Sequence, residues 1–215
     1  MDNILWNISK IKYILVCMNQ KQQNELLKYF SKTRLDSYLP NETVPKQFRL
    51  YKKNIKLCRK FYTKLHYFEI IFRNAIDSAL TLYVNCGDWI NLLPLDKDSQ
   101  HKITEVKNRL SKQNKQITHD RIISELTLGF WTTLFSKRYT QCKFQSFLVK
   151  KVFKDCPKSQ RNIKNIQIYV NEIREIRNRV CHYENIIHYA DINQKYQIIQ
   201  TCISWISTDL APIVK

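Results

Sequence analysis

The stretch KQFRLYKKNIKLCRKFYTKLHYFEIIFRNAIDSALTLY, Lys46–Tyr83, contains neither proline nor glycine. Its apolar side chains recur at steps of three and four residues, which is the period of one face of an α-helix. Such spacing puts an apolar stripe on one side of the helix and leaves the other side to basic residues. We therefore expect one long amphipathic helix here. The stripe comprises Leu57, Phe61, Leu65, Phe68, Phe72, Ala75, Ala79 and Tyr83.

The rest of the chain is also poor in residues that interrupt helices, with two glycines and five prolines among 215 residues. This composition favours an all-α fold over a sheet protein, which needs many tight turns. Gly87 and Gly129 cannot build a glycine-rich phosphate loop, so Rossmann and P-loop folds are excluded. Further helices are predicted over residues 22–38, 99–113, 118–139, 162–183 and 191–210.

The formal net charge of +18 exceeds what solubility needs and indicates a polyanionic partner. Nucleic acid is the first candidate and an acidic membrane surface the second; lysine-rich solvated faces encoded by an A+T-rich genome are the alternative. Residues 46–66 hold eight Lys and Arg residues and no acid, and residues 137–164 hold nine against Asp155 alone. This uneven distribution favours a basic face. The candidate RNA-binding residues are Lys52, Lys53, Lys56, Arg59, Lys60, Lys137, Arg138, Lys150 and Lys151.

Seven cysteines stand at irregular intervals, with no CxxC pair and no Cys and His at zinc spacing. We expect reduced thiols, no metal, no cofactor and a cytoplasmic location. The apolar start, Ile4–Cys17, contains Lys10 and is too short to span a bilayer, so no membrane partner is expected. Residues 1–17 are interpreted as an N-terminal extension, with Met18 as an alternative start, and residues 18–215 as a single α-helical domain.

One arginine is out of place on the helix predicted near the C-terminus. At about 100° per residue, Arg177 falls inside or at the edge of the apolar stripe. A guanidinium there must be desolvated unless a carboxylate, a carbonyl or a phosphate receives it, although long side chains can also reach solvent. Arg174, Asn178 and His182 fan out on the flank beside it. The stripe itself comprises Ile166, Val170, Ile173, Ile176 and Val180.

These side chains fit the cleavage of RNA without metal. A rigid arginine clamps a phosphate, the amide of Asn178 orients it, and His182 is a titratable acid or base. The base takes the proton from the ribose 2′ hydroxyl, that oxygen attacks the adjacent phosphorus, and the cation stabilises the anion that forms. One histidine plays only one proton-transfer role at a time. We therefore expect a symmetric homodimer that brings two copies of the helix together.

The six residues RNRVCH, Arg177–His182, resemble the motif of the HEPN ribonuclease superfamily, in which an arginine, a polar residue and three further residues precede a histidine. The segments CHYEN, YFEIIFRNAIDSAL and SELTLGFWTTLF resemble the Abi-like abortive infection proteins of that superfamily. Together with RLDSYLP and LYKKNIKLCRKFY, the likeness covers roughly residues 34–185.

This resemblance implies a HEPN-type helical bundle with additional helices that dimerises through the motif helix. It also implies a metal-independent endoribonuclease with a toxin-like role in defence against bacteriophage. A small structured regulatory RNA is a second implied partner besides the RNA substrate. Carried over residue by residue, Arg177 would bind and polarise the phosphate, Asn178 would position it, and His182 would transfer protons.

Four further residues are expected to support the motif: Glu69, Arg73, Arg174 and Glu184. Glu69 and Arg73 are one helical turn apart, and an ordinary ion pair between them is one interpretation. The other is that Glu69 reaches Arg174 or Arg177 and fixes its orientation. The pair Arg73 and Asn74 repeats the start of the motif, but its sixth position is Ser78, so it cannot be a second copy.

Two other classes of function remain open. One is a noncatalytic RNA-binding module that uses the same arginines only to hold phosphates. The other is a basic interaction protein for an acidic partner or a membrane surface. Phe130 and Trp131 are interpreted as core rather than as stacking platforms for bases. The remaining histidines have no partner at metal spacing and are assigned to surface or core: His66, His101, His119 and His188.

Overall fold

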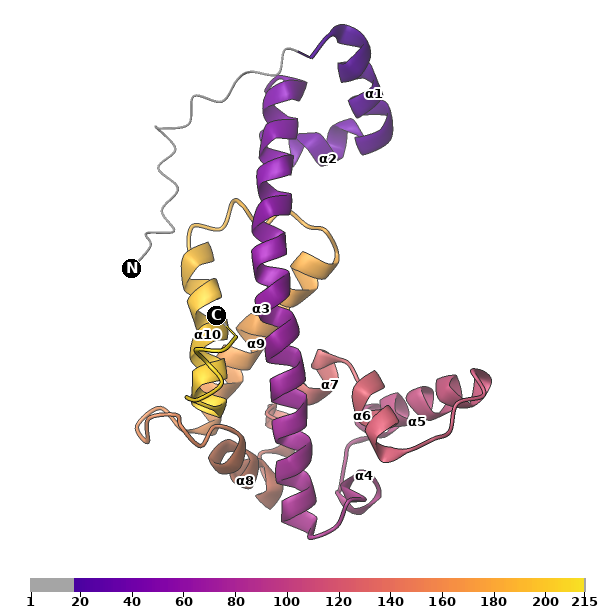
Figure 1. Cartoon of the computed structure of the whole chain (residues 1–215), viewed down its shortest axis with the longest axis vertical. Coiled ribbons are helices and arrows are strands. Elements are labelled where there is room, and N and C mark those ends of the chain that lie inside the picture. The colour runs from indigo at the N-terminus through magenta and orange to yellow at the C-terminus, as the bar shows by residue number, and fades with distance from the viewer. Residues whose placement is uncertain (1–17, 215) are drawn as a thin grey trace. The chain divides into compact units, whose positions relative to one another are not determined.

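The computed structural model describes residues 18–214, which form ten α-helices and one short 3-10 helix with no strand in that range (Figure 1). The expected all-α class is confirmed there. The interpretation of residues 1–17 lies outside the described part. None of the helices between residues 18 and 214 is both long and apolar enough to cross a bilayer. The α-helices are α1 (Gln20–Phe30), α2 (Lys32–Asp36), α3 (Val44–Val84), α4 (Trp89–Leu92), α5 (Lys97–Lys112), α6 (His119–Glu125), α7 (Leu128–Thr133), α8 (Lys143–Val152), α9 (Ile163–Cys181) and α10 (Ile192–Ile206), with η1 (Lys137–Tyr139) between α7 and α8.

The helices pack into two compact units, each discontinuous in sequence. The first unit joins the chain up to Tyr62 with Asn178–Tyr196. The second unit contains Thr63–Arg177 and the chain from Gln197 onward. The division falls within α3, α9 and α10. The single HEPN domain expected over residues 18–215 stays a prediction.

The long helix predicted from the apolar spacing is confirmed as α3, an unbroken helix from Val44 to Val84 (Figure 1). Its buried face differs slightly from the predicted stripe. Ile76 and Leu80 are fully buried, whereas Ala75 and Tyr83 are half-buried. Ile76 and Leu80 adjoin the predicted stripe on the helix surface. Burying these aliphatic side chains removes more apolar area from water than burying Ala75 would. The predicted stripe residues that are buried are Phe61, Leu65, Phe68, Phe72 and Ala79.

Aromatic rings fill the core of the second unit. The ring of Phe72 lies 5.0 Å from that of Phe68, 5.6 Å from that of Phe135 and 6.0 Å from that of Phe153, measured between centroids. Phe130 and Trp131 are fully buried, which confirms their assignment to the core. This packing fixes α3 against α7 and α8, and so fixes the side chains that α3 presents to the rest of the unit.

The single helix predicted over residues 118–139 is wrong, because the chain breaks into α6, α7 and η1. A continuous helix would join the Leu128 amide to the Ser124 carbonyl. Instead, the Leu128 amide donates to Glu69 Oε1 at 3.2 Å, and the Ser124 carbonyl accepts from Arg73 Nη1 at 3.2 Å. Two side chains one turn apart on α3 therefore replace the missing helical hydrogen bond. Thr127 takes an extended backbone at the break.

The helix predicted over residues 22–38 is also wrong, because it is interrupted between α1 and α2. Ser31 has a φ of 62°, a left-handed conformation that no helix interior allows, and its Oγ accepts from the amide of Arg34 to begin α2. The hydroxyl thus caps the second helix in place of a continued first one. The predicted helices near the C-terminus are confirmed as α9 and α10, with α10 ending at Ile206 rather than at residue 210.

A buried asparagine organises the first unit. Asn54 of α3 is 3% exposed. Its Nδ2 donates to the Tyr38 hydroxyl at 3.3 Å and to the Glu184 carbonyl at 3.1 Å, and its Oδ1 accepts from the Ile186 amide at 2.9 Å. A buried amide with these bonds satisfied holds the segment after α9 in one conformation.

Candidate functional site

The apolar stripe predicted on α9 is confirmed, and Arg177 lies at its edge. The guanidinium of Arg177 belongs to the second unit, and its side chain is 29% exposed. The helical wheel predicts this half-buried position, because the sector that holds the stripe also holds position 177. The stripe residues, all buried, are Ile166, Val170, Ile173, Ile176 and Val180.

The charge of Arg177 is balanced by Glu69, but no residue that the structure describes uses its hydrogen-bond donors. Its Nε lies 3.5 Å from Glu69 Oε2, close enough for an ion pair but without a hydrogen bond. This Nε is buried and has no hydrogen-bond partner among residues 18–214. The terminal nitrogens of Arg177 likewise form no hydrogen bond within the described chain. A half-buried fork of donors is therefore left for an acceptor-rich ligand.

Glu69 is held so that one oxygen faces Arg177. Its Oε1 accepts from the Leu128 amide at the break between α6 and α7, and its Oε2 is the atom nearest the guanidinium. Glu69 therefore reaches Arg177, as one of its two interpretations predicts, and that it fixes the orientation of the arginine stays a prediction. The ion pair between Glu69 and Arg73 is absent from the described part of the chain. Arg73 instead donates to the Ser124 carbonyl and, through Nε, to Asn74 Oδ1 at 3.3 Å.

Asn178 and His182 belong to the first unit, and both side chains are exposed. His182 comes immediately after the end of α9, and its backbone amide donates to the Asn178 carbonyl at 2.9 Å. Neither side chain forms a hydrogen bond or ion pair with any residue from 18 to 214. An exposed imidazole of this kind can exchange protons with a bound substrate, but no carboxylate orients it within this part of the chain.

The turn after α9 contains a residue that sequence reasoning missed. Tyr183 has a φ of 58°, and its side chain is 75% exposed. Its carbonyl accepts from Arg34 Nη2 at 2.6 Å, and the next amide, of Glu184, closes the helix end on the Arg179 carbonyl at 2.9 Å. Glycine or asparagine would mark such a position in a sequence, whereas tyrosine does not. The carboxylate of Glu184 pairs with Arg179 Nη1 at 2.7 Å rather than with Arg177, Asn178 or His182.

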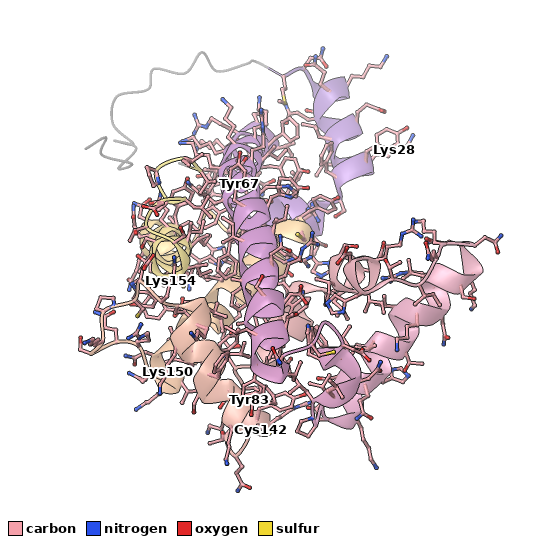
Figure 2. The ribbon with its side chains drawn as sticks, turned by 60° about the horizontal axis from the view of Figure 1, so that its bottom comes forward. Lys28, Tyr67, Tyr83, Cys142, Lys150 and Lys154 are labelled. Atoms are coloured by element: carbon pink, nitrogen blue, oxygen red, sulfur yellow. The ribbon has the colours of Figure 1, made fainter. Side chains whose placement is uncertain are left out.

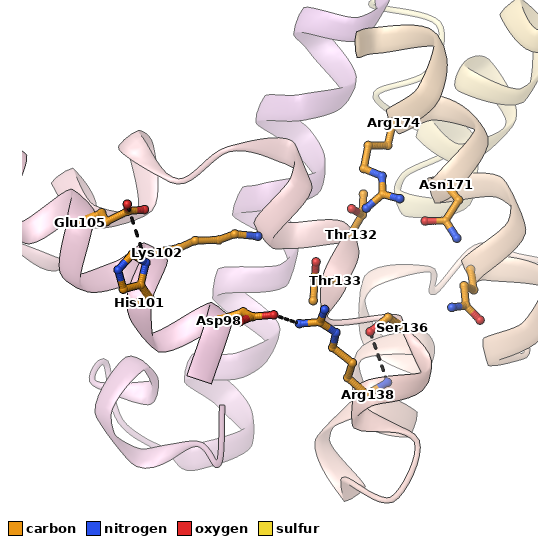
Figure 3. A pocket seen from close by; sticks show the side chains of 11 residues that line it. Asp98, His101, Lys102, Glu105, Thr132, Thr133, Ser136, Arg138, Asn171 and Arg174 are labelled. Atoms are coloured by element: carbon orange, nitrogen blue, oxygen red, sulfur yellow. Dashed lines mark hydrogen bonds and ion pairs between the residues drawn. The ribbon is translucent and has the colours of Figure 1, made fainter. Parts of the chain in front are cut away.

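Arg174, expected to support the motif, lines an open cleft of about 560 Å³ in the second unit. The cleft is formed by α5, by residues 132–138 at the end of α7 and in η1, and by α9 (Figure 3). Figure 3 shows Arg174 and Asn171 reaching in from α9 and Lys102 extending across from α5. Sequence reasoning missed Lys102 and Asn171, because the walls of the cleft come from segments far apart in the chain.

The acids and cations of this cleft are paired unequally. Arg138 Nη1 lies 2.5 Å from Asp98 Oδ2 and 3.2 Å from Asp96 Oδ2. The hydrogen bonds to these two carboxylates raise the pKa of the arginine, and the bond to Asp98 has the larger effect. Glu105 lies 3.7 Å from His101 Nδ1. Lys102 and Arg174 have no hydrogen bond or ion pair among the described residues. Lys102 and Arg174 are therefore the lining cations that no acid of the described chain contacts.

The predicted RNA-binding residues divide between the two units. Those of α3 belong to the first unit, where Lys53 is half-buried and the others are exposed. Lys137, Lys150 and Lys151 belong to the second unit and are exposed, and Figure 2 marks Lys150 at the surface of α8. Arg138 is held by its two acids. No group of three His, Cys, Asp or Glu side chains between residues 18 and 214 is arranged to hold a metal ion.

Comparison of the chain with family models, with curated proteins and with solved structures finds no match to any of them. The likeness to the HEPN superfamily therefore rests on the residues of the motif and its flanking segments. It stays a prediction from the sequence.

Proposed function

We propose that the chain is a metal-independent endoribonuclease of the HEPN type that acts as a homodimer. The observation that carries the proposal is the guanidinium of Arg177, half-buried beside Glu69 with no hydrogen bond to any described residue. A stable helix gains nothing from a desolvated donor group without an acceptor. A phosphate oxygen is the acceptor that a rigid guanidinium fork suits best.

The proposed reaction begins when His182 takes the proton from a ribose 2′ hydroxyl. The 2′ oxygen attacks the adjacent phosphorus, and the donors of Arg177 receive the negative charge that grows on the phosphate oxygens. Asn178 orients the phosphate. The bond to the 5′ oxygen breaks, and that oxygen takes a proton from His182 of the second copy, which leaves a 2′,3′-cyclic phosphate.

The proposal is tested by incubating the purified full chain with RNA in EDTA. We expect cleavage products that end in 2′,3′-cyclic phosphate, lost in both Arg177→Ala and His182→Ala while RNA binding survives. Retained cleavage in His182→Ala would point to a contaminating nuclease or to another site. Expression in bacteria supplies the matching test of the toxin-like defence role: growth slows with the native chain and recovers with Arg177→Ala.

A noncatalytic RNA-binding module, which would hold a small structured RNA, is the second candidate. It is favoured by one observation: the imidazole of His182 has no partner within residues 18–214 that would orient it for proton transfer. This candidate predicts tight RNA binding without cleavage and no effect of His182→Ala. RNA that copurifies with the chain at one defined length would support a regulatory partner, whereas a mixture of lengths would reflect charge alone.

A further inference from the structure

The cleft that Arg174 lines has two cations without a partner among residues 18–214. Arg174 from α9 and Lys102 from α5 are half-buried and make no hydrogen bond or ion pair with the described chain. The nearby acids Asp98 and Glu105 already face Arg138 and His101. An anion entering the cleft thus meets two cations that give up no existing contact to bind it.

The walls of the cleft are polar. Its lining includes the amides of Gln167 and Asn171 and the hydroxyls of Thr132 and Thr133, and it has no aliphatic side chain and no aromatic one other than His101. Pockets that hold a base or another flat apolar group are lined mainly by hydrophobic and aromatic side chains. This lining suits phosphate oxygens and sugar hydroxyls instead.

We propose that this cleft binds the ribose–phosphate backbone of a single RNA strand, with phosphates on Arg174 and Lys102, and does so without reading the bases. The proposal rests on the proposed function, because Arg174 lies three residues before Arg177 on α9. That separation is about 4.5 Å along the helix axis. It is comparable with the rise of roughly 3.4 Å per nucleotide along a stacked strand. A strand cut beside Arg177 would therefore place a neighbouring phosphate at the cleft.

The test measures binding of fluorescently labelled oligouridine and oligoadenosine to the full chain carrying His182→Ala, which prevents cleavage. Arg174→Ala and Lys102→Ala should each weaken binding about tenfold, the effect of one charge-assisted hydrogen bond. Each should also lower the slope of log affinity against log salt by about 0.7. The losses should be equal for the two sequences. Lys107→Ala is the matched control, since it removes the same charge from α5 outside the cleft.

Three outcomes overturn the proposal: binding by both cleft variants that equals that of Lys107→Ala, a loss confined to one base, or a uridine monophosphate affinity equal to that of the oligonucleotide. The last result would make the cleft a site for a small phosphorylated ligand. Arg174→Lys keeps the charge and should recover part of the affinity, which separates lost contact from lost folding. RNA cleavage is assayed separately. If the native chain cleaves RNA and Arg174→Ala leaves KM unchanged, the proposal for the cleft is wrong and the nuclease proposal stands. If the native chain does not cleave RNA but Arg174→Ala weakens binding, the nuclease proposal is wrong and the proposal for the cleft stands.

Discussion

The dipeptide Arg-Asn occurs at Arg73 and again at Arg177, and the two arginines differ in what their donors contact. Arg73 donates to the Ser124 carbonyl and to its own neighbour, Asn74. Arg177 faces a carboxylate at 3.5 Å and keeps a buried Nε without an acceptor in the described chain. The same dipeptide therefore contains one arginine whose donors bind within the fold and one whose donors remain for a ligand.

Glu69 links the two arginines. It lies one turn before Arg73 on α3, and with it replaces the hydrogen bond that is missing between α6 and α7. Its other oxygen faces Arg177. One carboxylate therefore contacts both the break in the helix and Arg177.

The largest expected effect distinguishes His182, five residues after Arg177, from Ser78, five residues after Arg73. His182→Ala should lower the rate of RNA cleavage by about 10²–10⁴-fold, because a general acid–base group contributes roughly that factor. The histidine is exposed, so the thermal midpoint should hardly move. The measurement is the single-turnover cleavage rate, with Ser78→Ala as the control at the equivalent place after Arg73. Equal cleavage rates in His182→Ala and Ser78→Ala would show that His182 takes no part in the reaction.

Arg177→Ala should lower cleavage by about 10²–10³-fold, the loss typical of removing one donor to a developing anion. Arg177→Lys should recover little, since an ammonium cannot reproduce the two parallel donors of a guanidinium. Both variants are compared with Arg73→Ala by the same cleavage assay. A chain in which Arg73→Ala cleaves as poorly as Arg177→Ala would erase the distinction between the two arginines.

Glu69→Gln should lower cleavage by about 10–100-fold, the usual effect of losing a group that orients a functional side chain. The amide oxygen can still accept from the Leu128 amide, so the break between α6 and α7 should persist. The control is Glu125→Gln, which removes a surface partner of Arg109 at 2.8 Å. Cleavage and the free energy of unfolding are measured together. Normal cleavage by folded Glu69→Gln would show that Arg177 needs no such support.

Arg73→Ala should change stability rather than activity. It leaves the Ser124 carbonyl without its donor, and because this carbonyl is near the surface we expect a loss of about 1 kcal/mol in the free energy of unfolding. Urea unfolding measures the loss, and cleavage should stay within about twofold of the native rate. A larger fall in activity than in stability would assign Arg73 to the reaction after all.

The smallest effect concerns the contact between Arg138 and Asp96, which, like the contacts of Arg73, lies within the fold. Partial burial raises the pKa of Asp96, but hydrogen bonds from Ser99 and Arg138 together bring it below its ordinary value. A lowered pKa stabilises the folded chain above the unfolded value of about 3.9, and this contribution is lost as the pH falls through the folded pKa. The difference in unfolding free energy between the native chain and Asp96→Asn should stay under about 1 kcal/mol above pH 5 and shrink towards pH 3. A difference that grows on acidification would contradict the assigned sign.

The sequence predicts those features that depend on one helix. The period of three and four residues locates α3, and the same period on α9 places Arg177 at the edge of the apolar stripe. The break after Glu125 could not be predicted, because the groups that replace its hydrogen bond lie on α3, more than fifty residues earlier. The cleft was missed for the same reason, since helices distant in sequence supply its walls.

The buried amide of Asn54 has a consequence for the order in which the chain is completed. It bonds the amide of Ile186, which lies 132 residues further along. A ribosome adding about 5–20 residues per second makes that stretch in roughly 7–26 seconds. During this time Asn54 lacks two of its hydrogen-bond partners, the Glu184 carbonyl and the Ile186 amide. The turn that carries His182 has not yet been made either. On the proposed function, the proton-transfer group at His182 is therefore made only after α3 and α9, so a chain that stops before residue 182 should bind RNA without cleaving it.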